Sequence, residues 1–272
     1  MGLDWLNEKW VFGLAVILYS LSALYSIFLH RQGFRQDNRL NYWLILCAFI
    51  PHTAAMAWRG VLAGRCPINN IYEMTVFVMW AMVATYLIFG AAPRFRYLGA
   101  YTSPLMLTMG IFALMPKLDA APELTQGWVS LHATLILLSY GAFGLGSVSS
   151  LMYLTQEHDL KFHKLRAALA RLPSIERLEL VSVRMTHSGF TLLSLGLLSG
   201  IFWLKNDYGV YFSSDPKVLW TWLVWALYLG LILLRLKWKL HGRRFAWGVV
   251  GSFLFVLLTF WGFNLLSSIH HQ

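Results

Sequence analysis

Charged residues are scarce in this sequence. Asp, Glu, Lys and Arg make up 12% of the 272 residues, whereas hydrophobic residues make up 58%. A typical soluble domain is about one quarter charged, so the composition excludes an ordinary soluble protein. The apolar runs also lack the period-two alternation of a membrane β-barrel. We therefore predict an all-α, polytopic membrane helix bundle that forms a single domain over residues 1–272.

Several chemical signatures are also missing. The two cysteines, Cys47 and Cys66, form no CxxC pair, which removes a thiol-redox or zinc motif. One lies inside a predicted span and the other beyond it, which argues against a disulfide. There is no glycine-rich phosphate loop, no Ser–His–Asp signature and no intramembrane carboxylate chain of the kind found in ion pumps. We assign no catalytic residue.

What the sequence does contain is eight apolar stretches, each long enough to cross a bilayer as a helix, which takes about 20 residues. We expect these spans near residues 10–30, 41–63, 71–91, 97–116, 128–155, 186–204, 217–236 and 245–267. No small-residue cleavage site follows the first stretch, so we interpret it as a retained span rather than a signal peptide.

The basic residues are distributed unevenly between the loops. Of the 22 Lys and Arg residues, 16 lie in the loops after the first, third, fifth and seventh spans. Because basic loops stay cytoplasmic, this bias predicts that both termini lie on the outer face. We read the net charge of +10 as a topology signal and expect no nucleic-acid partner. The long basic segment 156–184 is either a connector resting on anionic lipid headgroups or a docking site for a cytoplasmic partner. Within it, Pro173 and Ser174 predict that a helix restarts at IERLELVSVR.

An aromatic loop joins the sixth and seventh predicted spans on the outer face. It reads YGVYFSSDPKVLWTW, from Tyr208 to Trp222. Its candidate ligand-contacting residues are Tyr208, Tyr211, Phe212, Asp215 and Trp220. A flat aromatic surface of this kind suits a large planar ligand.

Three histidine positions add to this picture. His132 lies about one turn into the fifth span from the outer face, and His270 and His271 follow the last span on the same face. Two imidazoles across an aromatic surface can hold haem iron axially. His52 lies near the middle of the second span, where an imidazole must face the protein interior or a cavity. It is either a hydrogen-bonded histidine at the Pro51 kink or a staging ligand, that is, a residue that holds haem briefly on its way through the membrane to the outer face.

The remaining histidines carry weaker signals. We interpret four of them as solvated or interfacial: His30, His158, His163 and His241. We expect His187, near the cytoplasmic end of the sixth span, to cap or hydrogen-bond within the bundle. The GLLSG sequence from Gly196 to Gly200 in the same span predicts close helix packing.

Five segments in this order resemble the CcsA/CcmC/HemX group of cytochrome c assembly membrane proteins, including YpjD-like members. They are PINNIYEMTVFVMW, LHATLILLSYGAF, HSGFTLLSLGLLSGIFW, YGVYFSSDPKVLWTWLVWALYL and GRRFAWGVVGSFLFVLLTFWGFNLLSSIHH. The fourth is similar to the group's tryptophan-rich "WGxYWxWDPKExW" signature. The resemblance covers nearly the whole chain.

The resemblance implies haem handling at the outer face of a bacterial inner membrane, for delivery to apocytochrome c. It implies that His132 and His270 are the flanking haem ligands, with haem b as a transient ligand or cargo. It also implies a haem lyase (cytochrome c synthase) complex in which a CcsB-like subunit would be a separate chain. Three signature tryptophans are replaced by Tyr208, Phe212 and Ser214.

These departures draw the sequence toward the HemX and YpjD branch. A third histidine of the group falls on Gly230. An alternative function is therefore a HemX-like membrane regulator of haem biosynthesis that acts on glutamyl-tRNA reductase. A small-molecule transporter has less support, since no inverted repeat or pair of broken helices is evident.

Overall fold

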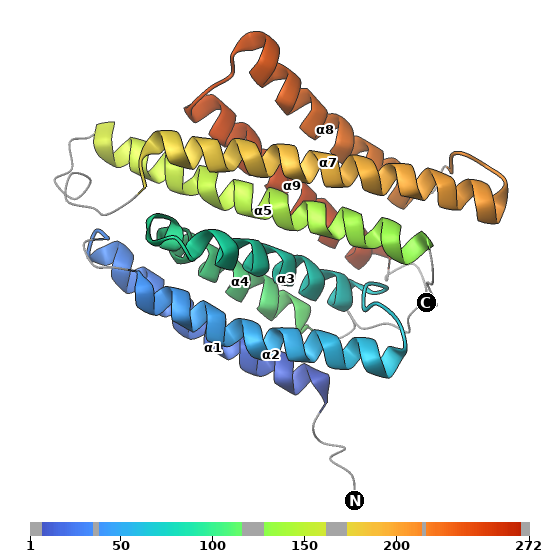
Figure 1. Ribbon diagram of the computed structural model, residues 1–272, viewed down its shortest axis with the longest axis horizontal. Helices are drawn as coiled ribbons and strands as arrows, with labels where there is room; N and C mark the ends of the chain where they lie inside the picture. The colour runs from blue at the N-terminus through green and yellow to red at the C-terminus, as the bar shows by residue number, and fades with distance from the viewer. Residues whose placement is uncertain (1–6, 35–37, 116–127, 162–172, 214–215, 268–272) are drawn as a thin grey trace, which may run out of the picture.

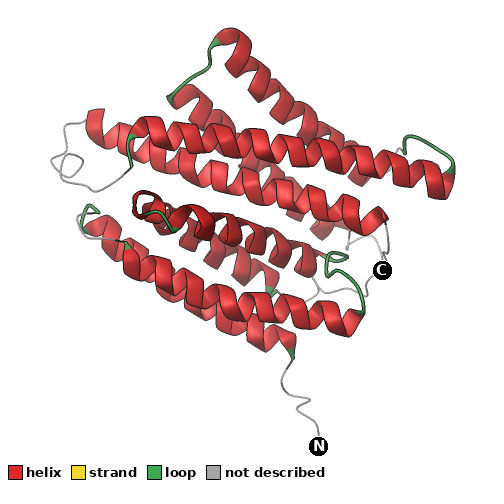
Figure 2. Ribbon diagram, viewed as in Figure 1, coloured by secondary structure: helices red, strands yellow, loops and turns green. Residues whose placement is uncertain are grey.

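The computed structural model describes residues 7–34, 38–115, 128–161, 173–213 and 216–267. Over these residues the chain forms α-helices and one short 3-10 helix, with no strand (Figures 1 and 2). The elements are α1 (Glu8–Arg31), α2 (Arg39–Ala63), α3 (Ile71–Gly90), η1 (Pro93–Leu98), α4 (Gly99–Ala113), α5 (Trp128–Lys161), α7 (Ile175–Tyr208), α8 (Pro216–Trp238) and α9 (Arg243–Ser267).

Each α-helix lies on one of the eight predicted spans, so the prediction of a polytopic helical bundle is confirmed. Within the described ranges, six helices are long and apolar enough to cross a membrane: α1, α2, α3, α5, α7 and α8. α4 has only 15 residues, and η1 leads into it. The protein is a multi-pass membrane protein.

The helices α5 and α7 are longer than their predicted spans. Each has 34 residues, or about 51 Å at 1.5 Å per residue, against a hydrocarbon core of about 30 Å. The second half of the long basic segment is not a separate connector, because α7 continues unbroken from Ile175 into the span. Ser174, in an extended conformation, is the N-cap residue.

The helices form two groups that meet along α3 and α5. Figure 1 shows α1, α2, α3 and α4 on one side and α5, α7, α8 and α9 on the other. Small residues allow the contact: a Cβ placed on Gly141 of α5 would lie 2.6 Å from the Cβ of Ala81 in α3. α5 and α7 also pack closely, since a Cβ on Gly189 would lie 2.5 Å from the Phe143 ring.

The helices alternate in direction, which gives the bundle two ends (Figure 1). We call the end that carries the connections after α1, α3, α5 and α8 the basic end, because 16 of the 22 Lys and Arg residues belong to the loops that the sequence predicted there, including residues that the structure places in the adjoining helices. The opposite end carries residues 64–70 and 209–213, the start of α1 and the end of α9. We call it the His132 end, and loop charge predicts that it faces outward.

A buried group of ionised side chains lies at the His132 end. The Glu73 carboxylate accepts hydrogen bonds from Arg59 Nε at 2.9 Å, from Arg65 Nη1 at 2.9 Å and from the Asn69 backbone N–H at 2.9 Å. Arg59 also donates to Glu8 at 2.8 Å. We call Glu8, Arg59, Arg65 and Glu73 the Glu73 cluster, and it ties together α1, α2, α3 and the loop that joins α2 to α3.

Candidate functional site

His132 is the fifth residue of α5 and lies half-buried against α7. Its Nδ1 is 2.6 Å from the backbone carbonyl oxygen of Gly196. Because a carbonyl oxygen can only accept, Nδ1 carries the proton and Nε2 keeps its lone pair. Among the described residues, no hydrogen-bond partner is found for Nε2. Histidines that bind metals in proteins are commonly oriented in this way, with the second nitrogen donating to a carbonyl or carboxylate.

Gly200 of α7 makes room for this imidazole, and Gly196 makes room for the neighbouring Ile136 of α5. A Cβ on Gly200 would lie 2.6 Å from both Cε1 and Nδ1 of His132, and a Cβ on Gly196 would lie 2.9 Å from Cγ1 of Ile136. The GLLSG sequence therefore does more than pack two helices, because it also seats and orients His132. The sequence shows two glycines four residues apart, but this spacing by itself predicts only close helix packing.

His52 lies in a different environment. It is fully buried between α1, α2 and α3, one residue after Pro51 in α2. Its Nε2 is 3.1 Å from the carbonyl oxygen of Val76, so Nε2 donates, and its Nδ1 accepts from the Tyr19 hydroxyl at 3.0 Å. Both nitrogens are occupied, which favours the structural alternative for His52 over a staging ligand.

We predict that a His52→Ala variant loses stability and keeps its ligand. Two interhelical hydrogen bonds and a buried ring would be lost, a cost of about 2–4 kcal/mol. The free energy of unfolding in detergent measures this loss, and haem absorbance per folded protein should match the wild type. Lower haem content in the folded fraction would contradict this prediction and restore the staging role.

The aromatic loop is only partly described. Tyr211 and Phe212 are 61% and 53% exposed, and the Lys205 ammonium lies 4.8 Å from the centroid of the Tyr211 ring. Asp215 lies outside the described residues, and so do His270 and His271. The backbone of Tyr208 ends α7, but the position of its side chain is not described. Two aromatic rings are thus available at the surface of the His132 end.

Trp220 belongs to the first turns of α8. Its ring packs on Phe255 of α9, with centroids 5.0 Å apart. Trp225 of α8 donates to Ser194 of α7 at 2.9 Å, so these two residues lie at the same depth in the bundle. Because α7 and α8 run antiparallel, Trp220, five residues before Trp225, lies near the depth of Gly200, five to six residues after Ser194. Gly200 contacts His132, so Trp220 also lies near the depth of His132.

The helix α9 reaches the same depth. A Cβ on Gly144 of α5 would lie 2.9 Å from the Phe253 ring of α9, and the two helices run antiparallel. His132 lies twelve residues before Gly144 in α5. The same distance along α9, twelve residues after Phe253, ends at about residue 265. The described end of α9 thus lies beside the level of His132, and His270 follows this end in the sequence.

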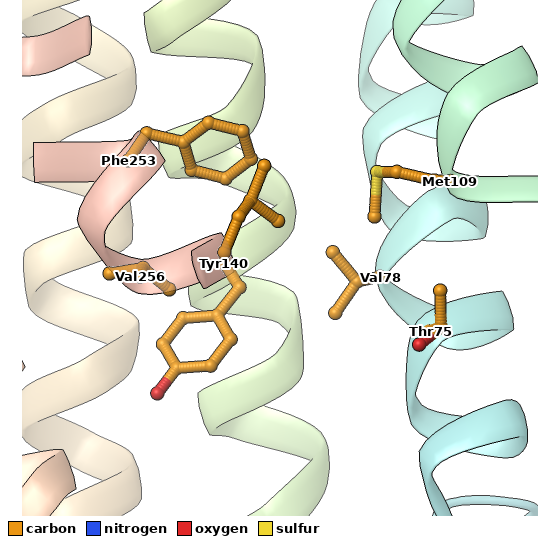
Figure 3. Close-up of a pocket in the computed structure, with 7 residues that line it drawn as sticks. Thr75, Val78, Met109, Tyr140, Phe253 and Val256 are labelled. Atoms are coloured by element: carbon orange, nitrogen blue, oxygen red, sulfur yellow. The ribbon is translucent and has the colours of Figure 1, made fainter. Parts of the chain in front are cut away.

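One hollow inside the described part of the bundle is too small for a large ligand. A hollow between α3, α4, α5 and α9 has a volume of about 10 Å³, which holds at most one water molecule. Figure 3 shows Val78, Thr75 and Met109 facing Tyr140, Phe253 and Val256 across it. A macrocycle would not fit into this hollow.

The fold and site define a polytopic helical membrane protein with an oriented histidine near one membrane face. The profile of the family described as "Cytochrome C assembly protein" matches residues 68–271. The chain belongs to this family, as its motifs predict.

The similar proteins carry two kinds of name. Protein HemX of Brevibacillus brevis is 31% identical over 261 residues, covering 94% of this chain and 96% of its own. Protein HemX of Bacillus subtilis (strain 168) is 26% identical, with 94% of each chain covered. The cytochrome c biogenesis protein CcsA of Synechococcus sp. (strain RCC307) is 30% identical, covering 85% of this chain and 83% of its own.

Proposed function

We propose that the protein binds haem at its His132 end and presents it there for cytochrome c maturation. The observation that carries this proposal is the hydrogen bond from His132 Nδ1 to the Gly196 carbonyl, which leaves Nε2 free to bind iron. Membership of the cytochrome c assembly family supports haem as the ligand. We assign His132 and His270 as the two residues that would bind the haem iron.

The chain contributes positioning and iron ligation rather than acid–base chemistry. α7 orients the His132 ring through Gly196 and Gly200. Tyr211, Phe212 and Trp220 offer aromatic faces to the macrocycle, and Tyr208 and Asp215 are assigned to the same surface from the sequence. His52 is left out of the ligand set because its ring nitrogens are both occupied.

The cellular location and the partners are proposed from the same family membership. We infer a multi-pass protein of the bacterial inner membrane, with haem b as transient ligand or cargo and apocytochrome c as the acceptor. A CcsB-like subunit in a separate chain would complete a haem lyase complex.

The direct test is the haem content of the purified protein. Wild type isolated in detergent from haem-replete cells is expected to show haem absorbance in stoichiometric or partial amount. Complete absence of haem under these conditions, in protein that remains folded, would remove the proposal.

A Gly200→Ala variant is predicted to bind haem about 10- to 100-fold more weakly, because its methyl group would displace the oriented His132 ring. Gly251→Ala in α9 is the matched control, since a Cβ there meets no atom within 4 Å. Haem titration followed by absorbance measures both affinities. Equal affinities for the two variants would show that α7 does not orient the ligand.

A second candidate function is favoured by the two HemX relatives, which match the chain over nearly its full length. It is a membrane regulator of haem biosynthesis that acts on glutamyl-tRNA reductase through the basic end. Deletion of residues 159–172, most of which lie outside the described ranges, would then change the abundance of the reductase. Loss of cytochrome c with unchanged reductase would instead favour haem presentation.

A further inference from the structure

A hollow of about 270 Å³ lies at the basic end, far from His132. It opens between the last turns of α5 and the first turn of α9. Its lining residues are Leu154, Glu157, His158, Lys161, Arg243 and Trp247. We propose that this hollow binds the headgroup of an anionic phospholipid, a role that is independent of haem binding.

The cations that would contact the phosphate come from two helices. Lys161 ends the described part of α5 and is exposed, and it has no ion-pair or hydrogen-bond partner among the residues that the structure describes. Arg243 begins α9, and its Nε lies 3.9 Å from the Glu157 carboxylate. Its two Nη groups have no partner within the described ranges, so they are available for a bidentate contact with phosphate oxygens.

The acidic residue of the lining does not cancel both of these charges. Glu157 is one carboxylate against two cations, and it interacts with Arg243 only at the long distance of 3.9 Å. Asp159 lies 3.6 Å from His158 Nδ1, so this carboxylate has a partner of its own. The first-turn N–H groups of α9 add partial positive charge at the same place, because α9 starts at the basic end.

The order of polar and apolar residues selects a lipid rather than a soluble anion. On α5, Leu154 lies one to two turns deeper in the bundle than His158 and Lys161, on the same face of the helix. On α9, Trp247 lies one turn deeper than Arg243 and is 55% exposed. Both walls thus pass from charged to apolar toward the membrane interior, which matches a phosphate followed by acyl chains.

The backbone supports this arrangement at the start of α9. Gly242 has φ of +63°, and its N–H donates to the Glu179 carboxylate at 3.2 Å. Arg235 donates to the same carboxylate at 2.7 Å. Glu179 of α7 therefore fixes the turn that presents Arg243, while remaining outside the lining of the hollow.

Lipid titration followed by native mass spectrometry tests the proposal. The full-length protein in a non-ionic detergent is titrated with phosphatidylglycerol, with phosphatidylcholine and with soluble glycerol phosphate. Wild type is expected to bind one phosphatidylglycerol in preference to the other two. The Lys161→Gln, Arg243→Gln double variant should bind it roughly 25-fold more weakly, about fivefold for each charge removed.

The matched control is Arg31→Gln, Arg94→Gln, which removes two exposed charges from the same end without touching the hollow. This control should bind phosphatidylglycerol as the wild type does. Unchanged binding by the Lys161 and Arg243 variant would overturn the site. Equal binding of phosphatidylcholine would overturn its charge selectivity, and equally tight binding of glycerol phosphate would overturn the assignment to a lipid. If the double variant unfolds, Lys161→Gln alone should still weaken binding about fivefold.

Discussion

A His132→Ala variant is expected to lose haem, with affinity lowered by more than about 100-fold. Changes to groups that only orient a metal ligand cost 10- to 100-fold, so the loss of the ligand itself should cost more. His132 Nε2 is the nitrogen that the hydrogen bond to Gly196 leaves free. Haem titration of the purified variant, followed by absorbance, measures the change.

The matched control is His187→Ala. His187 is an exposed histidine of α7 whose Nδ1 bonds to the carbonyl oxygen of Val183 in its own helix at 2.8 Å. This variant should keep the haem affinity of wild type. Added imidazole should partly restore the absorbance of His132→Ala, which a purely structural role of His132 would not allow. Undiminished haem in His132→Ala would end its assignment as a ligand.

A Glu73→Gln variant is expected to lose about 3–5 kcal/mol of stability, because it leaves two arginines of the Glu73 cluster without their shared carboxylate. The Glu73 side chain is fully buried, and that of Arg65 is only 3% exposed. Glutamine keeps the shape and one acceptor oxygen, so the effect reports mainly on charge. Unfolding of the purified protein in detergent measures it.

The comparison for this prediction is Glu179→Gln. Glu179 pairs with Arg235 at 2.7 Å, but both side chains are partly exposed, so removal of this charge should cost only about 1 kcal/mol. Equal losses for Glu73→Gln and Glu179→Gln would mean that burial does not set the strength of these ion pairs. Because the Glu73 cluster fastens the loop after α2, its loss should also expose residues 64–70 to proteolysis.

The sequence was sufficient to locate the helices. Apolar runs define spans directly, since the bilayer leaves few other ways to satisfy backbone hydrogen bonds. It also indicated where α7 begins, because Pro173 and Ser174 precede the helical pattern IERLELVSVR, but it did not show that this helix runs without a break into the sixth span. Helical continuity there depends on packing, as where Ser182 of α7 meets Ser150 of α5 at 2.6 Å.

The site was predicted less completely. Its depth singled out His132, but its orientation depends on Gly196, 64 residues later in the chain. The same holds for His52, whose partners Tyr19 and Val76 come from other helices. Glu73 lies near the outer end of its predicted span, but the local sequence does not pair it with Arg59 or Arg65. Such pairings arise from tertiary contacts that no local pattern encodes.

The unbroken α7 helix sets the distance between His132 and the aromatic loop. Eight residues separate Gly200, beside His132, from Tyr208 at the end of the helix, which fixes an axial offset of about 12 Å. One inserted residue would raise the aromatic loop by about 1.5 Å and turn it by about 100°. The height of the loop is thus set by a count of residues rather than by their identity. Aromatic residues of the loop can therefore be exchanged for one another while the surface that they form keeps its distance from the histidine.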